Sequence, residues 1–410
     1  MSPASILAYA PGTWRWPSIP GSTRYYLWSL AERGWPVLYV EPPQRWTWKT
    51  SIWRAEDRPF TVATLPCVPP FGVRGIPFES SGEWLRWFTS NRMKSAAHAF
   101  CKSETFTPQI LWLGAPWQSR LIPTGTQKPL VVHHNYDELA MSPFLKPFQQ
   151  NLLRSWETEL ITQSALVLCS SHAQAAKRRS LNSSTHVLEN AVKDEFLQVS
   201  SEEPPVMPES TRTLVEELRK LPRPLLVYGG VVDHRLNSDW FSAVQKAYPT
   251  GTLVFLGNLD ATASPEMVKI LKESSNTWGG KRIAHDDYPW LYAEADVLLY
   301  AHEQTPFTEG MFPDKMGEYM ASGKPIVSIR TPELERLAGE SRKNVIRLAG
   351  TQEEFLNHIH QALNENDPIY PALRRGLAAK RTWNTQTTRL ERILERSLKA
   401  SGNSKAPESP

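Results

Sequence analysis

The chain has 410 residues, of which 40% are hydrophobic and 21% are charged, so it is not a disordered chain and can form two hydrophobic cores. Its formal net charge of +4 is too small to indicate nucleic acid as a partner. The three cysteines, Cys67, Cys101 and Cys169, lie far apart and predict neither a disulfide framework nor a metal site. No apolar stretch approaches the ~20 residues of a membrane-spanning helix, and the first residues lack the pattern of a signal peptide, so we expect a cytoplasmic protein.

Short β-rich runs alternate with helical segments in the first half of the chain. Strands are predicted at 5–11, 36–42, 61–67, 110–116, 130–135, 165–171 and 185–191. Helices are predicted at 22–33, 83–102, 144–163 and 172–180. Strands that are apolar on both faces, with helices between them, indicate a parallel sheet covered on each side. Residues 1–200 are therefore predicted to form a doubly wound, Rossmann-like domain.

A proline-rich, charged segment at 201–223 interrupts this pattern and is predicted to be an interdomain linker. Strands are then predicted at 225–230, 252–258, 282–284, 296–301, 325–329 and 344–349. Helices are predicted at 236–248, 265–275, 288–295, 313–322, 331–338 and 352–364. We interpret residues 224–375 as a second doubly wound α/β domain, 376–399 as a helix packing back toward the N-terminal domain, and 400–410 as a disordered tail.

Doubly wound domains bind ligands outside the carboxyl ends of their strands, and helix N-termini at that edge suit phosphate. Gly229 and Gly230 follow a predicted strand directly, which lets backbone amides approach a ligand closely. Arg235 comes just before the next helix, where a guanidinium can bind two diphosphate oxygens. The alternative is an ordinary strand-to-helix turn with a solvated arginine.

Lys315 and Glu318 lie three positions apart, on one face of the helix predicted at 313–322. In one interpretation they form a surface ion pair worth under ~1 kcal/mol. In the other, the lysine binds phosphate near the helix N-terminus and the glutamate accepts hydrogen bonds from a ribose diol. Because the helix follows a strand and a long loop, its start is expected at the ligand edge of the sheet.

The segment "PFTEGMFPDKMGEYMASGKPIVS" (306–328) resembles the donor-binding signature of GT-B glycosyltransferases, especially family 4 (group 1) retaining enzymes of bacterial polysaccharide and teichuronic acid biosynthesis. The positions that fit are Pro313, Lys315, Met316, Glu318, Tyr319, Met320, Ala321, Gly323, Lys324, Pro325, Ile326 and Val327. The segments "YGGVVDHRLN" (228–237) and "KRIAHDDYPWLYAEADVLLY" (281–300) are similar to others of that family. The likeness covers most of residues 105–330 and implies two Rossmann-like domains facing a central cleft.

The resemblance implies that Glu318 binds the ribose of a nucleotide sugar and that Arg235 and Lys315 bind its diphosphate. Phe241 stands where the family often has a second basic residue, so Lys315 is expected to replace it. The Gly229 and Gly230 amides are expected to assist by stabilising the departing diphosphate. His285, Asp286 and Tyr288 are implied to lie near the nucleobase. Glu309 is implied near the sugar, although eight residues rather than the usual seven separate it from Glu318.

In the N-terminal half, Gly21 and Ser22 resemble the loop and helix start that approach the donor phosphate, with Ser22 as N-cap. A simple capped amphipathic helix is the alternative. His133 and Asp137 stand where the family keeps a histidine or aspartate near the sugar. His133 and His134 are adjacent in a strand and point to opposite faces, so at most one reaches a substrate. The alternative is one packed and one solvated histidine.

The activity implied by the resemblance is transfer of a sugar from a nucleotide-sugar donor, UDP- or GDP-linked, with retention. No further cofactor and no metal are expected, because cations line the site and no Asp-x-Asp cluster is present. The acceptor class is a polysaccharide, glycolipid or lipid-linked glycan. The alternatives are a nucleotide-sugar epimerase on the same fold and a GT-B protein that binds a nucleotide sugar or glycan without transfer.

Tryptophan is concentrated in the first part of the chain, where stretches 45–54 and 83–94 interleave it with Arg and Lys. This composition suits peripheral contact with the inner face of a membrane or with an anionic lipid-linked acceptor. A surface that stacks carbohydrate or nucleic acid has a similar composition. Packing of these tryptophans in an ordinary core is the other interpretation.

Overall fold

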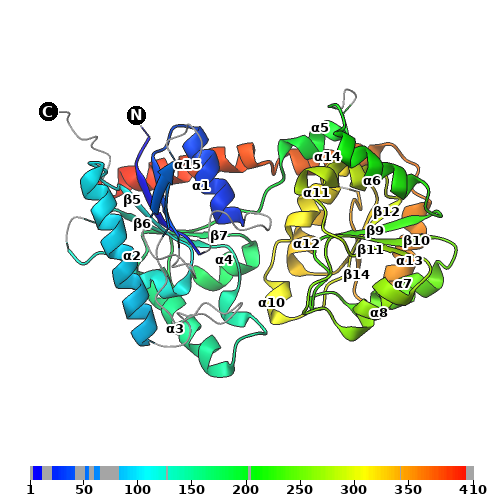
Figure 1. The fold of residues 1–410 in the computed structure, drawn as a ribbon, viewed down its shortest axis with the longest axis horizontal. Helices are drawn as coiled ribbons and strands as arrows, with labels where there is room; N and C mark the ends of the chain where they lie inside the picture. Colours follow the sequence, from blue (N-terminus) through cyan, green and yellow to red (C-terminus); the bar gives the residue numbers. More distant parts are fainter. Residues whose placement is uncertain are drawn as a thin grey trace. The chain divides into compact units, whose positions relative to one another are not determined.

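The computed structural model describes residues 3–11, 21–41, 51–54, 60–64, 83–125, 128–201, 205–341 and 343–402. Contacts divide the chain into an N-terminal unit, Met1–Glu189 with Gln386–Pro410, and a C-terminal unit, Asn190–Thr385. The ribbon in Figure 1 shows strands bordered by helices in each unit. The boundary falls at Glu189, before the 201–223 segment that was predicted to be a linker.

The N-terminal unit contains an eight-stranded sheet with the order β3-β4-β2-β1-β5-β6-β7-β8. All neighbouring pairs are parallel except β3 with β4. The strands are β1 (Ile6–Tyr9), β2 (Val37–Val40), β3 (Ser51–Arg54), β4 (Phe60–Thr64), β5 (Ile110–Leu113), β6 (Leu130–Asn135), β7 (Leu166–Cys169) and β8 (Thr185–Val187). Every residue of β1, β2, β5, β6 and β7 is buried, as expected for strands covered on both faces.

The helical elements of this unit are α1 (Ser22–Glu32), α2 (Glu83–Ser103), η2 (Pro116–Leu121), η3 (Leu139–Met141), α3 (Pro147–Gln163) and α4 (His172–Arg178). Helix α15 (Trp383–Ala400) belongs to this unit from Gln386 onward. An Arg33–Glu391 ion pair and a 2.9 Å hydrogen bond from Trp35 Nε1 to Glu391 Oε1 attach it to the segment after α1.

The C-terminal unit contains a parallel six-stranded sheet with the order β11-β10-β9-β12-β13-β14. Its strands are β9 (Leu225–Gly229), β10 (Thr252–Leu256), β11 (Thr277–Gly279), β12 (Val297–Tyr300), β13 (Ile326–Ile329) and β14 (Arg347–Ala349). The first three strands run outward from β9 and the last three outward from β12. The direction in which successive strands are added therefore reverses between β9 and β12, and doubly wound sheets bind ligands at the carboxyl ends of the strands at such a switch point.

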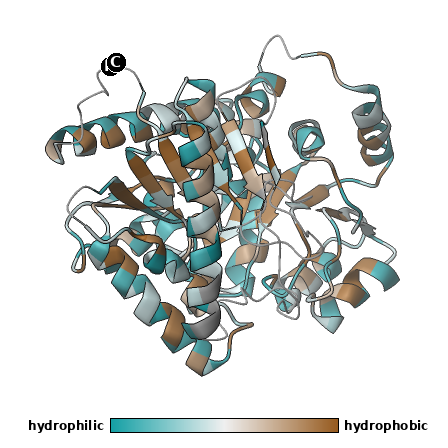
Figure 2. Cartoon of the chain, turned by 60° about the vertical axis from the view of Figure 1, so that its left-hand side comes forward, coloured by the Kyte–Doolittle hydropathy of each residue, from teal (hydrophilic) through white to brown (hydrophobic). Residues whose placement is uncertain are grey.

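The helical elements of the C-terminal unit are α5 (Asp194–Val199), α6 (Glu209–Arg219), α7 (Ser238–Ala247), α8 (Pro265–Glu273), η4 (His285–Asp287), α9 (Tyr288–Ala293), α10 (Pro306–Glu309), α11 (Asp314–Ser322), α12 (Pro332–Ala338), α13 (Gln352–Leu363) and α14 (Ile369–Ala379). In Figure 2 the hydrophobic colour is frequent on the strands, whereas on the helices it alternates with hydrophilic colour, as expected for helices with one apolar side. Burying that side against the sheet stabilises each helix. Helix α7, for example, buries Phe241 and Val244.

Several predicted boundaries were wrong. The 201–223 segment contains α6, which buries Thr211, Val215 and Leu218 within the C-terminal unit and is not a linker. The single helix predicted at 376–399 is two helices, α14 and α15. The strand predicted at 282–284 lies earlier, as β11. Residues 45–50 of the Trp-rich 45–54 stretch lie outside the described residues, as do residues 403–410 of the predicted tail.

Candidate functional site

The carboxyl ends of β9 and β12 in the C-terminal unit bring together most of the predicted site. Tyr228, Gly229 and Gly230 end β9 and begin the following loop, and His302 follows β12. Helix α11 starts beside them with Pro313 as N-cap, and Gly323 ends it with a left-handed φ of 76°. The helix places Lys315 in its first turn and Glu318 one turn later.

Lys315 is a half-buried cation in the first turn of α11. Within the described ranges its ammonium makes no hydrogen bond or ion pair, and Nζ lies 5.6 Å from the centre of the Tyr228 ring. Gly230, with a φ of +129°, makes room for it, because a Cβ there would lie 2.0 Å from Lys315 Cε. Burial and then the charge of Arg235 lower the pKa of Lys315 to about 8. Such a group gains most from binding an anion.

The expected amide donors are already used. The Gly229 N–H donates to the Tyr319 hydroxyl at 2.8 Å, and the Gly230 N–H donates to the Leu256 carbonyl at 2.6 Å. The prediction that these amides stabilise a ligand was therefore wrong for this structure. The glycines are required for space instead, since a Cβ at Gly229 would lie 2.0 Å from the Tyr292 hydroxyl.

Arg235 lies in the loop after β9, but it is not the solvated arginine of the alternative interpretation. Its guanidinium donates from Nε and Nη2 to the Asp233 carboxylate, with the Nη2 bond at 2.6 Å. Burial alone would lower the pKa of Arg235 and raise the pKa of Asp233. The contact between the two outweighs burial, so the pKa of Arg235 is raised and that of Asp233 is lowered. Both groups are therefore charged. The sequence analysis did not identify Asp233.

Glu318 does not form the surface ion pair with Lys315 that the spacing allowed. Its carboxylate instead contacts His285 Nε2 at 2.9 Å and accepts a hydrogen bond from the Tyr292 hydroxyl at 3.3 Å. Only 12% of the Glu318 side chain is exposed, so its orientation is fixed before any ligand arrives. Tyr292 was not identified from the sequence.

The remaining predicted residues of this unit are placed differently from one another. Asp286 has a largely exposed side chain and pairs with Lys193 at 2.8 Å. Tyr288 is buried, and its hydroxyl donates to the Leu256 carbonyl at 3.1 Å, so it acts as a core residue. Glu309 is exposed at the end of the short helix α10, and its carboxylate has no partner among the described residues.

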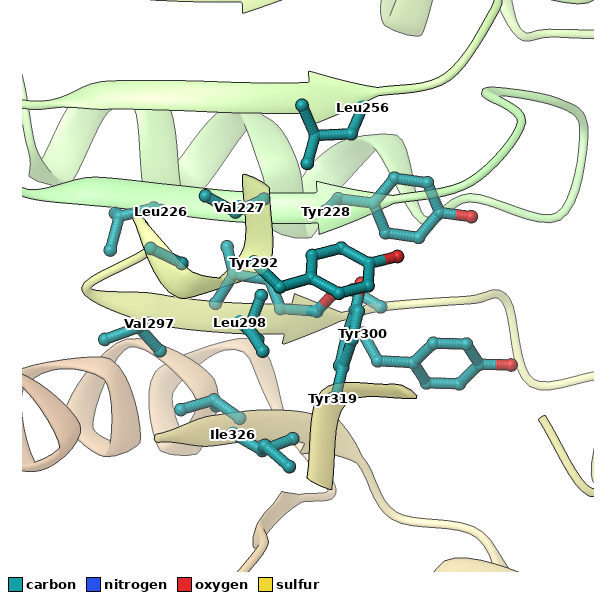
Figure 3. Packing of buried hydrophobic residues seen from close by; sticks show 14 of the residues in the cluster. Leu226, Val227, Tyr228, Leu256, Tyr292, Val297, Leu298, Tyr300, Tyr319 and Ile326 are labelled. Carbon is teal, nitrogen blue, oxygen red and sulfur yellow. The ribbon is translucent and has the colours of Figure 1, made fainter. Parts of the chain in front are cut away.

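A layer of buried tyrosines lies beneath these charges. Figure 3 shows Tyr228, Tyr292, Tyr300 and Tyr319 toward the arrowheads of the strands, whereas aliphatic residues such as Val297 lie toward their starts. Burial raises the pKa of all four hydroxyls, which are therefore neutral hydrogen-bond donors. Tyr300 and Tyr228 contact the two ring nitrogens of His302 at 2.8 and 3.3 Å. Burial lowers the pKa of His302 well below its usual value, so this histidine is neutral.

In the N-terminal unit, His133 and His134 are both buried, which contradicts the alternative interpretation of one packed and one solvated histidine. His133 Nδ1 contacts the Leu113 carbonyl at 3.1 Å, and His134 Nδ1 contacts Thr23 Oγ1 at 2.8 Å. Burial lowers their pKa values to about 4 and about 3. His133 is 1% exposed, so the structure does not present it to a ligand. Asp137 follows β6, and its carboxylate accepts the Glu138 N–H at 2.9 Å.

The first turn of α1 corrects the assignment of Ser22. Gly21, which has no side chain to cap the helix, is the N-cap, and Ser22 is the first helical residue. A Cβ at Gly21 would meet nothing within 4 Å, so no close approach within the described part of the chain requires glycine there.

The Trp- and Arg-rich stretch at 83–94 is only partly a surface. Trp87 is exposed, but Arg86 is buried and bonds to Glu83 and Glu159. Trp35, Trp112, Trp117 and Trp156 are core residues. Among the described helices, none combines the length and apolarity needed to cross a membrane. The described residues also contain no group of three or more His, Cys, Asp or Glu arranged to hold a metal ion.

Comparisons with known proteins agree with this fold. No protein-family model matches the chain. TuaH of Bacillus subtilis (strain 168), named as a teichuronic acid biosynthesis glycosyltransferase, is 21% identical over 253 residues, which are 59% of this chain and 60% of that protein. The match thus spans less than two thirds of that relative.

Solved structures match nearly the whole chain, and two of them serve as examples. The sucrose-phosphate synthase of Thermosynechococcus elongatus has a TM-score of 0.71 at 15% identity, covering 97% of this chain and all of that one. The Escherichia coli trehalose-6-phosphate protein bound with UDP-2-fluoro glucose has a TM-score of 0.67 at 11% identity, covering 96% and 99%. Fold and site together define a GT-B protein: two doubly wound units, the second with a cationic site at its switch point.

Proposed function

We propose that this protein is a glycosyltransferase whose C-terminal unit binds the nucleotide-sugar donor. The observation that carries the proposal is Lys315, a half-buried ammonium with no acceptor among the described residues, beside Arg235 at the switch point of the sheet. Two desolvated cations at this edge suit a diphosphate, which is the leaving group of a nucleotide sugar. The TuaH match and the UDP-2-fluoro glucose held by a protein of the same fold support the choice of ligand.

In the proposed complex, Glu318 accepts hydrogen bonds from the ribose diol, and Lys315 and Arg235 bind the diphosphate. As the glycosidic bond breaks, negative charge develops on the diphosphate, and fixed cations above a low-dielectric tyrosine layer stabilise that charge. Glu309, exposed and without a partner in the described part of the chain, remains the candidate for the sugar hydroxyls.

The finer features of the proposal come from the family resemblance. They are a UDP- or GDP-linked donor, retention at the anomeric carbon, no metal requirement, and a polysaccharide, glycolipid or lipid-linked acceptor. NMR of the product gives the anomeric configuration, and turnover with and without EDTA tests the metal requirement. We propose that the protein works in the cytoplasm, at the inner face of the membrane. Co-sedimentation of the protein with lipid vesicles tests the membrane contact.

Calorimetric titration with UDP, GDP, ADP and dTDP tests the donor site first. The wild type should bind one nucleotide saturably. Glu318→Gln should weaken binding of the nucleoside, its monophosphate and its diphosphate equally, by about 1–3 kcal/mol, because the ribose loses a charged hydrogen-bond acceptor. Glu273→Gln, an exposed carboxylate at the end of α8, is the matched control and should change nothing.

Binding of none of the four nucleotides by the wild type contradicts the proposal. Donor binding without transfer to any acceptor indicates the non-catalytic GT-B protein, and conversion of the donor without an acceptor indicates the epimerase. Release of nucleoside diphosphate only when an acceptor glycan is present supports the transferase.

A further inference from the structure

The carboxylate of Asp233 holds both the backbone and the guanidinium of Arg235 in place. Asp233 Oδ1 accepts the backbone N–H of Arg235 at 3.0 Å, which closes an Asx turn. The same carboxylate accepts from Nε of Arg235 at 3.0 and 3.1 Å and from Nη2 at 2.6 Å. Only 10% of the Asp233 side chain is exposed, so water competes little for these bonds.

These contacts occupy one edge of the guanidinium and leave the other open. A guanidinium has five N–H groups in a rigid fork. Nε and one hydrogen of Nη2 face Asp233, whereas Nη1 has no acceptor among the residues that the structure describes. The end edge, Nη1 with the second hydrogen of Nη2, can therefore still bind two oxygens of an anion.

We propose that Asp233 is a positioning residue, which fixes the side edge of Arg235 so that its end edge binds the diphosphate of the donor. The proposal rests on the proposed function. An unrestrained arginine would lose side-chain entropy on binding, whereas Arg235 has already lost it in the free protein. Preorganised donors are also the ones that stabilise developing charge without rearranging.

Asp233 also carries a negative charge close to the proposed anion site, so its substitution distinguishes positioning from two other effects. If repulsion of the diphosphate were its main effect, removing the charge would tighten binding. If the Asx turn were its main effect, asparagine, whose side-chain oxygen can also accept the Arg235 N–H, would replace it without loss. The proposal excludes both.

A double-mutant cycle on the preference for diphosphate over monophosphate tests the proposal, using the nucleotide that the wild type binds. Asp233→Asn should reduce that preference about tenfold. Arg235→Met should reduce it at least as much, and Asp233→Asn in the Arg235→Met background should reduce it no further. Asp260→Asn is the matched control, because Asp260 forms a similar Asx turn with Thr262 but holds no arginine. It should leave the preference unchanged.

A pH profile adds a readout that a purely structural role would not change. The titratable and charged groups around Lys315 are Tyr228 of β9, Asp233 and Arg235 from the loop after β9, Asp314 and Glu318 from α11, and His302 after β12. The negative charge of Asp233 raises the pKa of Lys315. In Asp233→Asn, Lys315 should therefore lose its proton, and the diphosphate its affinity, at a lower pH than in the wild type.

Three results overturn the proposal: an unchanged or increased diphosphate preference in Asp233→Asn, an equal loss in the Arg235→Met background, or a profile that does not move. Failure of the wild type to bind any nucleotide would instead contradict the proposed function.

Discussion

Replacing Lys315 with methionine should stabilise the protein and remove its phosphate site. A pKa lowered from 10.5 to about 8 corresponds to roughly 3 kcal/mol of penalty for the charged form in the folded state. Lys315 is only half-buried, so screening by water reduces the penalty, and we expect Lys315→Met to raise the free energy of unfolding by about 1–2 kcal/mol. Methionine keeps the length of the side chain against Gly230 without the charge.

The effect has a defined pH dependence. At pH 7 the lysine is protonated in both the folded and the unfolded chain, so the penalty is fully present. Between pH 8 and 10.5 the unfolded chain binds more protons than the folded chain, so the wild type gains stability as the pH rises. The difference in the free energy of unfolding between wild type and Lys315→Met should therefore be largest near neutral pH and should decrease as the pH rises above 8.

Differential scanning calorimetry measures this difference, read from the transition that belongs to the C-terminal unit. Because two units can unfold in separate steps, that transition is identified as the one that nucleoside diphosphate raises in the wild type. Lys269→Met, an exposed lysine of α8, is the control and should change the stability little. A Lys315→Met variant that is less stable than the wild type, or that binds the diphosphate as tightly, would refute the reasoning.

Two further predictions concern the tyrosine layer. Gly229→Ala should destabilise the C-terminal unit by about 1–3 kcal/mol, because the new methyl group overlaps the Tyr292 hydroxyl. Gly376→Ala, in an open position of α14, is the control and should stabilise the unit by up to about 1 kcal/mol. Thermal unfolding compares the two variants. Tyr319→Phe should cost about 1–3 kcal/mol, since it leaves a buried N–H of β9 and a carbonyl of β12 each without this partner. Tyr288→Phe should cost less, because its carbonyl acceptor keeps a second donor, and equal losses in the two phenylalanine variants would contradict this explanation.

The sequence was sufficient to predict the doubly wound architecture and the edge on which the site lies. The run 225–230, and the run 296–301 after its first residue Asp296, contain no charged side chain, and a strand buried on both faces requires this pattern. The first turn of α11 could also be located, because proline and aspartate precede an amphipathic segment. These features depend on residues that are neighbours in the chain, which is why a single sequence contains them.

The contacts that define the site could not be predicted in the same way. The Gly229 N–H is used by a tyrosine 90 positions later, so nothing near the glycine indicates that this donor is occupied. His133 Nδ1 contacts the Leu113 carbonyl of β5, 20 positions earlier, and nothing near the histidine in the chain indicates this partner. Asp233 is the exception: an aspartate two residues before an arginine, after a Gly-Gly turn, is a local signal for an Asx turn that the sequence analysis overlooked.

The position of the tyrosines explains how charged groups are tolerated at this edge. Each ring belongs to the hydrophobic core, and each hydroxyl contacts the polar layer above it, including Glu318, His302 and the backbone of β9. A layer of water in their place would screen Lys315 and Arg235, whereas aliphatic side chains would leave the backbone and the carboxylate without partners. The tyrosines therefore keep the local dielectric low while they satisfy the hydrogen bonds. In the proposed complex the two cations would attract the diphosphate strongly, and the bound anion would offset the part of the penalty for burying Lys315 that the neighbouring carboxylates leave.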